Sequence, residues 1–184
     1  MLASTEETTV NKLLNFGLGA LALLLATGTA LAQDACTTTT EGTAKLAEHP
    51  AVRAFYDALS TGNTDLVDCA VSATWTNSPS GPGTPAGPDG LKPSVGGMKA
   101  LFSEYSFETQ DVVVAGDKVV VRSMVTARQA AEFLGVAPGG DAVQFQTIDI
   151  HQLGDDGKLA QSWHVEDWLT FLFARGALPI KPAS

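Results

Sequence analysis

The stretch DVVVAGDKVVVRSMVTA, residues 111–127, contains the clearest secondary-structure signal in the sequence. Two runs rich in β-branched residues, 111–115 and 118–127, flank the dipeptide Gly116-Asp117. Such runs on both sides of a glycine-containing dipeptide predict a β-hairpin with a tight turn. The alternation of apolar and polar residues starts at Phe107, so we expect extended chain from that point.

Downstream of this hairpin the pattern remains that of strands. Residues 143–153 alternate between apolar and polar side chains, which predicts one strand. The turn signal 155–157, Asp-Asp-Gly, leads into a further strand expected from Lys158 to about His164. Residues 167–174 are apolar on most sides and precede Gly176, which predicts a short, buried closing segment.

Upstream of the hairpin the period is helical. Pro50 suits the first turn of a helix, because that turn needs no backbone donor, and apolar residues then recur at three-to-four spacing until Gly62. This apolar face consists of Val52, Phe55, Tyr56 and Leu59. A second short helix is expected from about Thr64 to Ala70. Helices followed by meandering antiparallel strands indicate the α+β class, with helices on one face of a curved sheet.

A long loop connects the helices to the hairpin. A short expected strand, residues 75–77, enters residues 78–90, which contain four prolines and four glycines and therefore predict a loop. A loop of this length is either a lid or rim over a site or a solvent-exposed insertion. We expect Ser94 to cap a short helix that continues to Leu101-Phe102.

Composition and charge restrict the class of protein. The chain has 184 residues, with 11 Lys plus Arg against 20 Asp plus Glu, a formal net charge of −9. Binding a nucleic-acid backbone requires clustered basic residues, so this balance argues against a nucleic-acid partner. With 45% hydrophobic and 17% charged residues, the composition is that of one globular domain.

The N-terminus is typical of a secretory signal peptide. Residues 13–32 form an apolar or small-residue run that follows Lys12 and ends in Ala30-Leu31-Ala32, a small-x-small cleavage pattern. The alternative is a membrane anchor, because about 20 apolar residues span a bilayer. We expect residues 1–32 to be a signal peptide, 33–47 an extended tail and 48–184 the functional domain. The mature protein is then secreted or periplasmic and is not attached to the membrane.

The sequence has two cysteines, Cys36 and Cys69, and both remain after cleavage at the expected site. In an oxidising compartment this favours one disulfide that ties the N-terminal tail to the helices. Two free thiols that never meet are the alternative.

Several local strings, in this order and spacing, resemble the SnoaL-like polyketide cyclase or ester cyclase family of the nuclear transport factor 2-like superfamily. The resemblance covers about residues 48–178. The strings are GDKVVVR at 116–122, EFLGVAP at 132–138, IDI at 148–150, DGKL at 156–159, Trp163, Asp167 and RGAL at 175–178. The resemblance implies a cone-shaped, cystatin-like fold in which a curved antiparallel sheet, packed on N-terminal helices, encloses a pocket. It also implies a homodimer and no metal or organic cofactor.

The resemblance assigns the main catalytic role to Asp167, as an acid/base group in an aldol closure. A carboxylate in an apolar cavity has a raised pKa, which suits proton transfer next to a carbonyl. The alternative for Asp167 is the capping of the closing helix. His151 shares the alternating face of Phe145, Thr147 and Asp149, and is expected to assist as donor or proton shuttle. A solvent-facing histidine at a strand end is the alternative for His151.

Other residues are expected to bind the substrate. They are Asn77, Trp75, Arg122, Gln129, Asp149, Trp163 and His164. Alternation places His164 and Glu166 on a common side. Asn77 has the alternative of a simple turn residue, and Gln129 departs from the family pattern, in which histidine is common at that position.

Other chemistries lack their signatures in the sequence. The available ligands His151, His164, Asp149 and Glu166 have no recognised metal spacing. There is no Gly-x-Ser-x-Gly elbow and no glycine-rich phosphate loop. We therefore expect an exported protein that binds a small, largely apolar carbonyl compound and performs cofactor-free acid/base chemistry, either aldol cyclisation or proton transfer. A non-enzymatic ligand-binding protein or a dimeric interaction module of the same fold are the alternatives.

Overall fold

The computed structural model of the chain describes residue 36 and residues 40–178. The chain divides into a unit of residues 1–30 and a unit of residues 31–184, and all described residues belong to the second unit. The expected signal peptide, residues 1–32, lies outside the described residues. Within the described part of the chain, no helix has the length and apolar character needed to cross a membrane.

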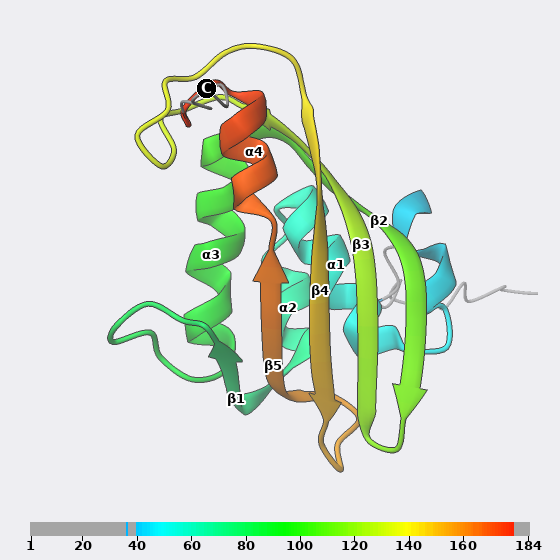
Figure 1. Cartoon of the computed structure of the whole chain (residues 1–184). Helices are drawn as coiled ribbons and strands as arrows, with labels where there is room; N and C mark the ends of the chain where they lie inside the picture. The colour runs from blue at the N-terminus through cyan, green and yellow to red at the C-terminus, as the bar shows by residue number, and fades with distance from the viewer. Residues whose placement is uncertain (1–35, 37–39, 179–184) are drawn as a thin grey trace, which may run out of the picture. The chain divides into compact units, whose positions relative to one another are not determined.

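A five-stranded sheet forms the framework (Figure 1). Its strands are β1 (Val71–Ser78), β2 (Phe102–Ala115), β3 (Lys118–Gln129), β4 (Val143–Leu153) and β5 (Leu159–Glu166), in the order β1-β5-β4-β3-β2. Strands β2 to β5 form the predicted antiparallel meander. The expectation of a wholly antiparallel sheet is wrong at one edge, because β1 pairs with β5 in parallel. Strand β1 is followed by a helix and not by a hairpin partner. It lies at the edge of the sheet, beside the last strand, β5.

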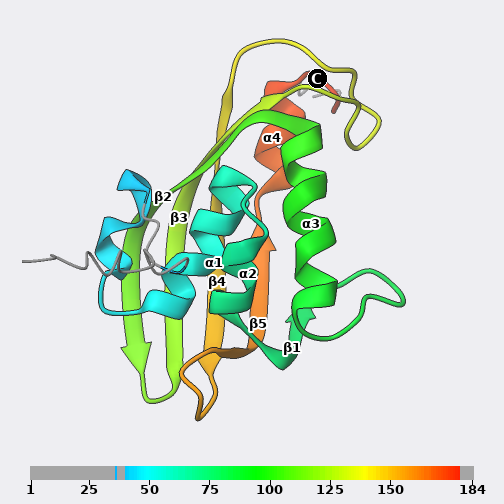
Figure 2. The ribbon, with the colours of Figure 1, turned by 180° about the vertical axis from the view of Figure 1, so that it is seen from behind.

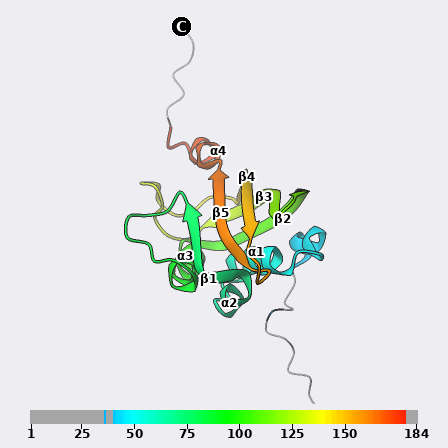
Figure 3. The same ribbon diagram turned by 90° about the horizontal axis from the view of Figure 1, so that it is seen from below.

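Helices cover one face of this sheet, as Figure 2 shows from behind and Figure 3 along the curved sheet. They are α1 (Pro50–Thr61), α2 (Asp65–Ala70) and α3 (Pro88–Leu101), and α4 (Trp168–Ala174) follows β5 and contacts β4. The predicted α+β class, with helices on one face of a curved sheet, is confirmed.

Helix α1 follows the sequence pattern closely. Pro50 stands in its first turn, and Gly62 ends it with a positive φ of 77° and an N–H that donates to the carbonyl of Ala58. A left-handed residue at this position is the usual end of a helix and favours glycine. Val52, Phe55 and Tyr56 are buried against the sheet, so the helix is held by its apolar face.

Two helical segments differ from the prediction. Helix α3 begins at Pro88, six residues before Ser94, and contains Pro93. Pro93 does not favour a helix interior, but Leu91 and Val95 are buried on either side of it and hold the helix in place. Residues 41–46, expected to be extended, form the 3-10 helix η2 (Glu41–Leu46), with Leu46 and Thr43 buried.

The loop between β1 and α3 is a rim, residues 79–87, that projects beyond the sheet in Figure 1. Its last residue, Gly87, has a φ of 71°, and its N–H donates to the carbonyl of Trp75 at 2.7 Å. A Cβ atom at Gly87 would collide with the carbonyl of Ala73. The end of the rim is therefore pinned to β1 by a residue that must lack a side chain.

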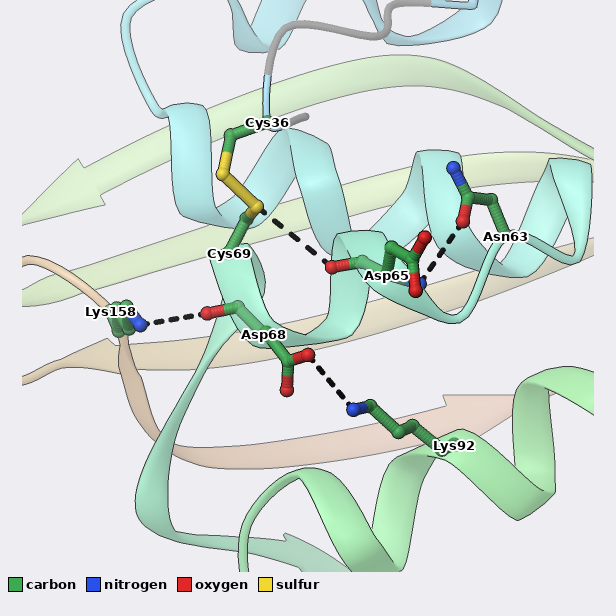
Figure 4. A network of polar contacts seen from close by, with 7 residues as sticks. All are labelled: Cys36, Asn63, Asp65, Asp68, Cys69, Lys92 and Lys158. Atoms are coloured by element: carbon green, nitrogen blue, oxygen red, sulfur yellow. Dashed lines mark hydrogen bonds and ion pairs between the residues drawn. A yellow bond between two sulfur atoms is a disulfide. The ribbon is translucent and has the colours of Figure 1, made fainter. Parts of the chain in front are cut away.

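The C-terminal end of α2 is tied to three other segments (Figure 4). The predicted disulfide between Cys36 and Cys69 is present and links the N-terminal segment to α2. The ammonium of Lys92 from α3 contacts the Asp68 carboxylate at 2.8 Å, and that of Lys158 donates to the Asp68 carbonyl at 2.7 Å. Helix α2 therefore joins the N-terminal segment, α3 and the start of β5.

Candidate functional site

A cavity of about 320 Å³ lies between the inner face of the sheet, helices α1 and α3, the rim loop and the start of α4. Its apolar wall is mainly aromatic, with Phe55, Trp75, Tyr105, Phe107, Phe133 and Trp168, and also includes Leu59, Leu91 and Met98. The predicted pocket within the curved sheet is confirmed. Most of these rings come from segments far apart in the sequence, so the cavity exists only in the folded chain.

Strands β4 and β5 contribute the titratable part of the polar wall of the cavity. Thr147 and Asp149 on β4 lie directly across from Glu166 and His164 on β5, and all four line the cavity. Side chains two residues apart on a strand share a face, so both pairs point inward together. The predicted common side for His164 and Glu166 is confirmed, as is the shared face of Asp149 and His151.

Asp149 is held by donors from two elements. The Tyr56 hydroxyl on α1 donates to Oδ2 of Asp149 at 2.9 Å, and the Thr147 hydroxyl donates to the same oxygen at 3.3 Å. Asp149 is 6% exposed. Its Oδ1 makes no hydrogen bond to the described residues, so this oxygen is free for a ligand in the cavity.

A chain of hydrogen bonds runs from β1 to Asp149. The indole N–H of Trp75 donates to Ser162 Oγ at 2.9 Å, Ser162 Oγ lies 2.9 Å from His151 Nδ1, and His151 Nε2 lies 3.1 Å from the Tyr56 hydroxyl oxygen. Because the single hydroxyl proton of Tyr56 goes to Asp149, the Tyr56 oxygen accepts from His151 Nε2–H. Neutral His151 then accepts at Nδ1 from the Ser162 hydroxyl. Every donor in the chain therefore points toward Asp149.

Burial sets the ionisation of this chain. The pKa of Asp149 is raised to about 7, chiefly by burial and also by the nearby Glu166 carboxylate, while the bonds from Tyr56 and Thr147 act in the opposite direction. Burial lowers the pKa of His151 to about 3, with a further contribution from His164. His151 is thus neutral at physiological pH, as the direction of its hydrogen bonds requires.

A second polar group lies at the β5 side of the cavity. His164 Nδ1 donates to the Asn77 side-chain oxygen at 3.1 Å, and its Nε2 lies 4.0 Å from Glu166 Oε2. Trp168 Nε1 donates to the same Glu166 oxygen at 2.7 Å. Since an amide oxygen only accepts, neutral His164 keeps its lone pair on Nε2. The expected cavity positions of Trp75, Asn77, Asp149 and His164 agree with the structure.

Asp167 does not line the cavity. It is exposed and forms the N-cap of α4, where Oδ1 accepts from the Thr170 N–H at 3.0 Å and Oδ2 from the Thr170 hydroxyl at 2.6 Å. These bonds to Thr170 lower the pKa of Asp167. The expectation of a cavity-facing aspartate at this position is therefore wrong, and its alternative, the helix cap, is what the structure contains.

Three expected substrate-binding residues lie elsewhere, and His151 lies behind the cavity wall. Arg122 forms an ion pair with Asp111 and donates to Gln146. Gln129 donates to the carbonyls of Ala131 and Val136. Trp163 stands between inward-facing Ser162 and His164, so it belongs to the other face of β5. His151 is fully buried, with both ring nitrogens engaged.

Three residues of the site, Tyr56, Tyr105 and Ser162, were not predicted from the sequence. Tyr56 was expected on the apolar face of α1, and a tyrosine at a buried position usually needs a partner for its hydroxyl. Ser162 is two residues before His164, so alternation along β5 carried its signal. The Tyr105 hydroxyl has no hydrogen-bond partner among residues 36 and 40–178, and burial raises its pKa well above the usual value.

No cluster of three or more potential metal ligands occurs among the described residues. The groups available for chemistry are two carboxylates, a histidine and a tyrosine hydroxyl on the wall of an aromatic cavity. This arrangement suits proton transfer to and from a bound organic molecule.

Comparison with known proteins points to one family. The model of the SnoaL-like polyketide cyclases matches residues 49–174. A search among curated proteins found no match.

Solved structures share this fold. TsrD from Streptomyces laurentii is 26% identical, with a TM-score of 0.63 over 70% of this chain and 93% of that one. A putative polyketide cyclase from Bacillus cereus is 28% identical, with a TM-score of 0.58 over 71% of this chain and 80% of that one. A putative SnoaL-like polyketide cyclase from Jannaschia is 22% identical, with a TM-score of 0.60 over 70% and 91%, and shows the fold alone.

Proposed function

The chain belongs to the SnoaL-like polyketide cyclase family, and from this premise we propose that it performs cofactor-free acid/base chemistry on a small, largely apolar carbonyl compound. The reaction is proton transfer next to the carbonyl, with aldol-type ring closure where the substrate carries a second carbonyl. We assign the acid/base role to Asp149, in place of Asp167.

The observation that carries this proposal is the environment of Asp149. Its carboxyl group faces an aromatic cavity, is almost fully buried and has a pKa of about 7. A group with a pKa near the working pH is present in both forms, so it can both take and return a proton. Because Oδ2 accepts from Tyr56 and Thr147, Oδ1 is the oxygen that exchanges the proton.

The proposed step is balanced without a co-reactant. Ionised Asp149 removes a proton from the carbon next to the carbonyl, and the electrons of that C–H bond form an enolate. The enolate carbon then attacks a second carbonyl, and the resulting alkoxide takes the proton back from Oδ1. The Tyr105 hydroxyl, which lines the cavity and keeps its proton, is available to donate to the enolate oxygen.

The other members of the hydrogen-bond chain position Asp149. His151 and Ser162 ensure that the Tyr56 hydroxyl donates to Oδ2, since His151 Nε2–H occupies the lone pair of Tyr56 that faces it. We therefore assign a positioning role to His151, which was expected to be catalytic.

Deuterium exchange into a ketone probe tests the assignment. The probe is 2-tetralone in D2O, and ¹H NMR follows the loss of its α-proton signals with and without protein. We expect exchange above the buffer rate for the natural protein, no excess for Asp149→Asn and a retained rate for Asp167→Asn. Asparagine is also a good helix cap, so the second variant keeps the start of α4 intact.

The result separates the rival assignments. Loss of exchange in Asp167→Asn with full exchange in Asp149→Asn would return the role to Asp167. Saturable binding of the probe without exchange in any variant would favour the alternative of a non-enzymatic ligand-binding protein. Near-UV circular dichroism of each variant verifies that the aromatic cavity is still folded.

We also propose that the protein is exported, in agreement with the signal-peptide pattern of residues 1–32. The disulfide between Cys36 and Cys69 supports this, because such bonds persist in oxidising compartments. Mass spectrometry of the protein from its native host tests the point. We expect the mass of a chain that begins near Gln33, less two hydrogens for the disulfide. A mass that still includes residues 1–32 would contradict cleavage.

The proposed oligomer is a homodimer formed through the outer face of the sheet. On this face Ile148 and Val165 pair across β4 and β5, and they are 49% and 73% exposed. Adjacent exposed apolar side chains favour association. Light scattering after size exclusion should give the mass of two chains, and Val165→Lys should reduce it to that of one. A monomer at all concentrations contradicts the proposal.

A further inference from the structure

The cavity has an unusual balance of charge. Its lining includes the carboxyl groups of Asp149 and Glu166 but no lysine or arginine. Two carboxyl groups on one wall, without a basic partner in the lining, create a negative potential that a low-dielectric surrounding strengthens. This potential repels a ligand that carries its own carboxylate or phosphate.

Each of these carboxyl groups has one oxygen without a partner. The protein donors reach Oδ2 of Asp149 and Oε2 of Glu166, whereas Oδ1 and Oε1 make no hydrogen bond to the described residues. Water can hydrate these two oxygens while the cavity is empty, and a ligand that displaces this water must replace its hydrogen bonds, so the cavity favours a ligand that brings a hydroxyl or an N–H.

His164 does not reverse this balance. Its Nδ1 is engaged with Asn77 Oδ1, and its Nε2 lies 4.0 Å from Glu166 Oε2. Any positive charge on the imidazole is thus adjacent to a carboxylate that offsets it.

The apolar wall reinforces the same preference. Six aromatic rings line the cavity, among them Trp75 and Trp168. The faces of such rings carry partial negative charge and attract cations, and they stack on the flat rings of a ligand. Both walls therefore favour an aromatic ligand that is neutral or positive.

We propose that this cavity selects its ligands by charge: it takes uncharged or cationic aromatic compounds that offer a hydrogen-bond donor, and it excludes carboxylates. The inference rests on the proposed function only in placing the ligand in the same cavity, and it does not require any reaction there. For a carbonyl substrate it means that an ester or a ketone enters, whereas the corresponding free acid does not.

A matched probe series tests this selectivity by isothermal titration calorimetry at pH 7.5. The probes share one ring system: 2-naphthylmethylamine as cation, 2-naphthylmethanol as neutral donor, 2-(methoxymethyl)naphthalene as neutral compound without a donor, and 2-naphthoate as anion. We expect the amine and the alcohol to bind. Compared with the alcohol, the methoxy compound should bind about threefold more weakly and the naphthoate at least about tenfold more weakly.

A pair of variants identifies the source of the selectivity. Glu166→Gln removes one negative charge but keeps a side-chain oxygen for the Trp168 N–H, and it should improve naphthoate binding about tenfold. Asp155→Asn makes the same change in net charge in the exposed turn between β4 and β5, and it should leave all four affinities unchanged. Equal gains in both variants would mean that only overall charge matters, which contradicts a local effect.

The pH dependence adds an independent measurement. Between pH 6 and 8 ionisation of Asp149 should strengthen binding of the amine and weaken binding of the naphthoate, and Asp149→Asn should remove both trends. The titratable groups that face Asp149 are Tyr56 from α1, Tyr105 from β2, His151 from β4, and His164 and Glu166 from β5.

The outcomes overturn or support this inference independently of the proposed function. Naphthoate binding within twofold of the alcohol, or binding of no probe at all, overturns the charge selectivity. Failure of the 2-tetralone exchange with the expected order of affinities overturns the catalytic proposal and leaves the charge selectivity in place. Exchange of 2-tetralone without the expected order of affinities overturns the charge selectivity and leaves the catalytic proposal in place.

Discussion

Asp149 in the middle of β4 and Asp167 at the start of α4 differ in one respect that determines their chemistry. Each accepts two hydrogen bonds from neighbouring groups. Burial nevertheless raises the pKa of Asp149 to about 7, whereas the bonds from Thr170 lower the pKa of the exposed Asp167. Access to water, and not the number of hydrogen bonds, therefore decides which aspartate can hold a proton at neutral pH.

The largest expected effect is on how stability changes with pH. Folded Asp149 holds its proton up to a pH of about 7, but unfolded aspartate loses it near pH 3.9. Between these values the folded state binds more protons, so this residue makes the free energy of unfolding fall as pH rises, by up to about 1.4 kcal/mol per pH unit. Asp149→Asn should remove this contribution, so urea denaturation from pH 4 to 7 should give a more positive slope of stability against pH than in the natural protein.

His151 also contributes to the pH dependence of stability in that measurement. Its folded pKa of about 3 lies below the unfolded value, so its contribution has the opposite sign and is lost as pH falls. In the natural protein the two slopes oppose each other between pH 4 and 6.5. Asp149→Asn should therefore show stability that rises with pH in this window, and an unchanged profile would contradict the burial argument.

Removal of a hydroxyl that donates to Asp149 should destabilise the protein more than removal of one that donates to Asp167. Tyr56→Phe leaves Asp149 and His151 without their shared partner, so we expect a loss of about 1 to 3 kcal/mol in the free energy of unfolding. The pKa of Asp149 should rise further, because the bond from Tyr56 lowers it. Chemical denaturation and a ¹³C NMR titration of the carboxyl group measure both effects. Tyr105→Phe is the matched control and should cost less.

The helix cap predicts a smaller effect at Asp167. Asp167→Ala removes the acceptor for the Thr170 N–H and should cost about 1 kcal/mol, whereas Asp167→Asn should cost only a few tenths, as asparagine also caps well. Urea denaturation of the two variants at pH 7 measures the difference. Equal losses in both would indicate that the charge, and not the cap geometry, is what α4 requires.

The smallest expected effect is that of Thr170→Ala. It removes the hydroxyl bond to Asp167 but keeps the backbone bond, so the free energy of unfolding should change by less than about 0.5 kcal/mol. The pKa of Asp167 should return part of the way to its ordinary value, because the Thr170 hydroxyl is the main cause of its lowering. An NMR titration of Asp167 that shows no upward change would contradict this.

Local patterns predicted much of the fold. Alternation along residues 143–153 placed Asp149 and His151 on the inner face, and Gly62 marked the end of α1, both as observed. Strands β1 and β2 extend further than predicted, and α3 begins earlier. In these places tertiary packing outweighs weak local preferences, as for Pro93 between the buried Leu91 and Val95.

The site was less accessible to prediction, because it depends on contacts across the chain. Tyr56 and Asp149 are 93 residues apart in sequence, and no local pattern reports their bond. On β5 a shift of one residue moves a side chain to the other face. Ser162 and His164 face inward, whereas Trp163, which the resemblance placed at the substrate site, lies on the other face. Asp167 lies one position beyond the strand, where the chain turns into α4 and alternation no longer applies.

The pinned end of the rim loop has a consequence for attempts to redesign the pocket. Gly87 tolerates no side chain beside Ala73, and it joins the rim to the strand that carries Trp75 and Asn77. Libraries that vary Ser80, Gly81 and Thr84, which line the cavity, change its entrance without moving this anchor. New ligand preferences are therefore most accessible to laboratory evolution at the tip of the rim, provided that Gly87 is kept invariant.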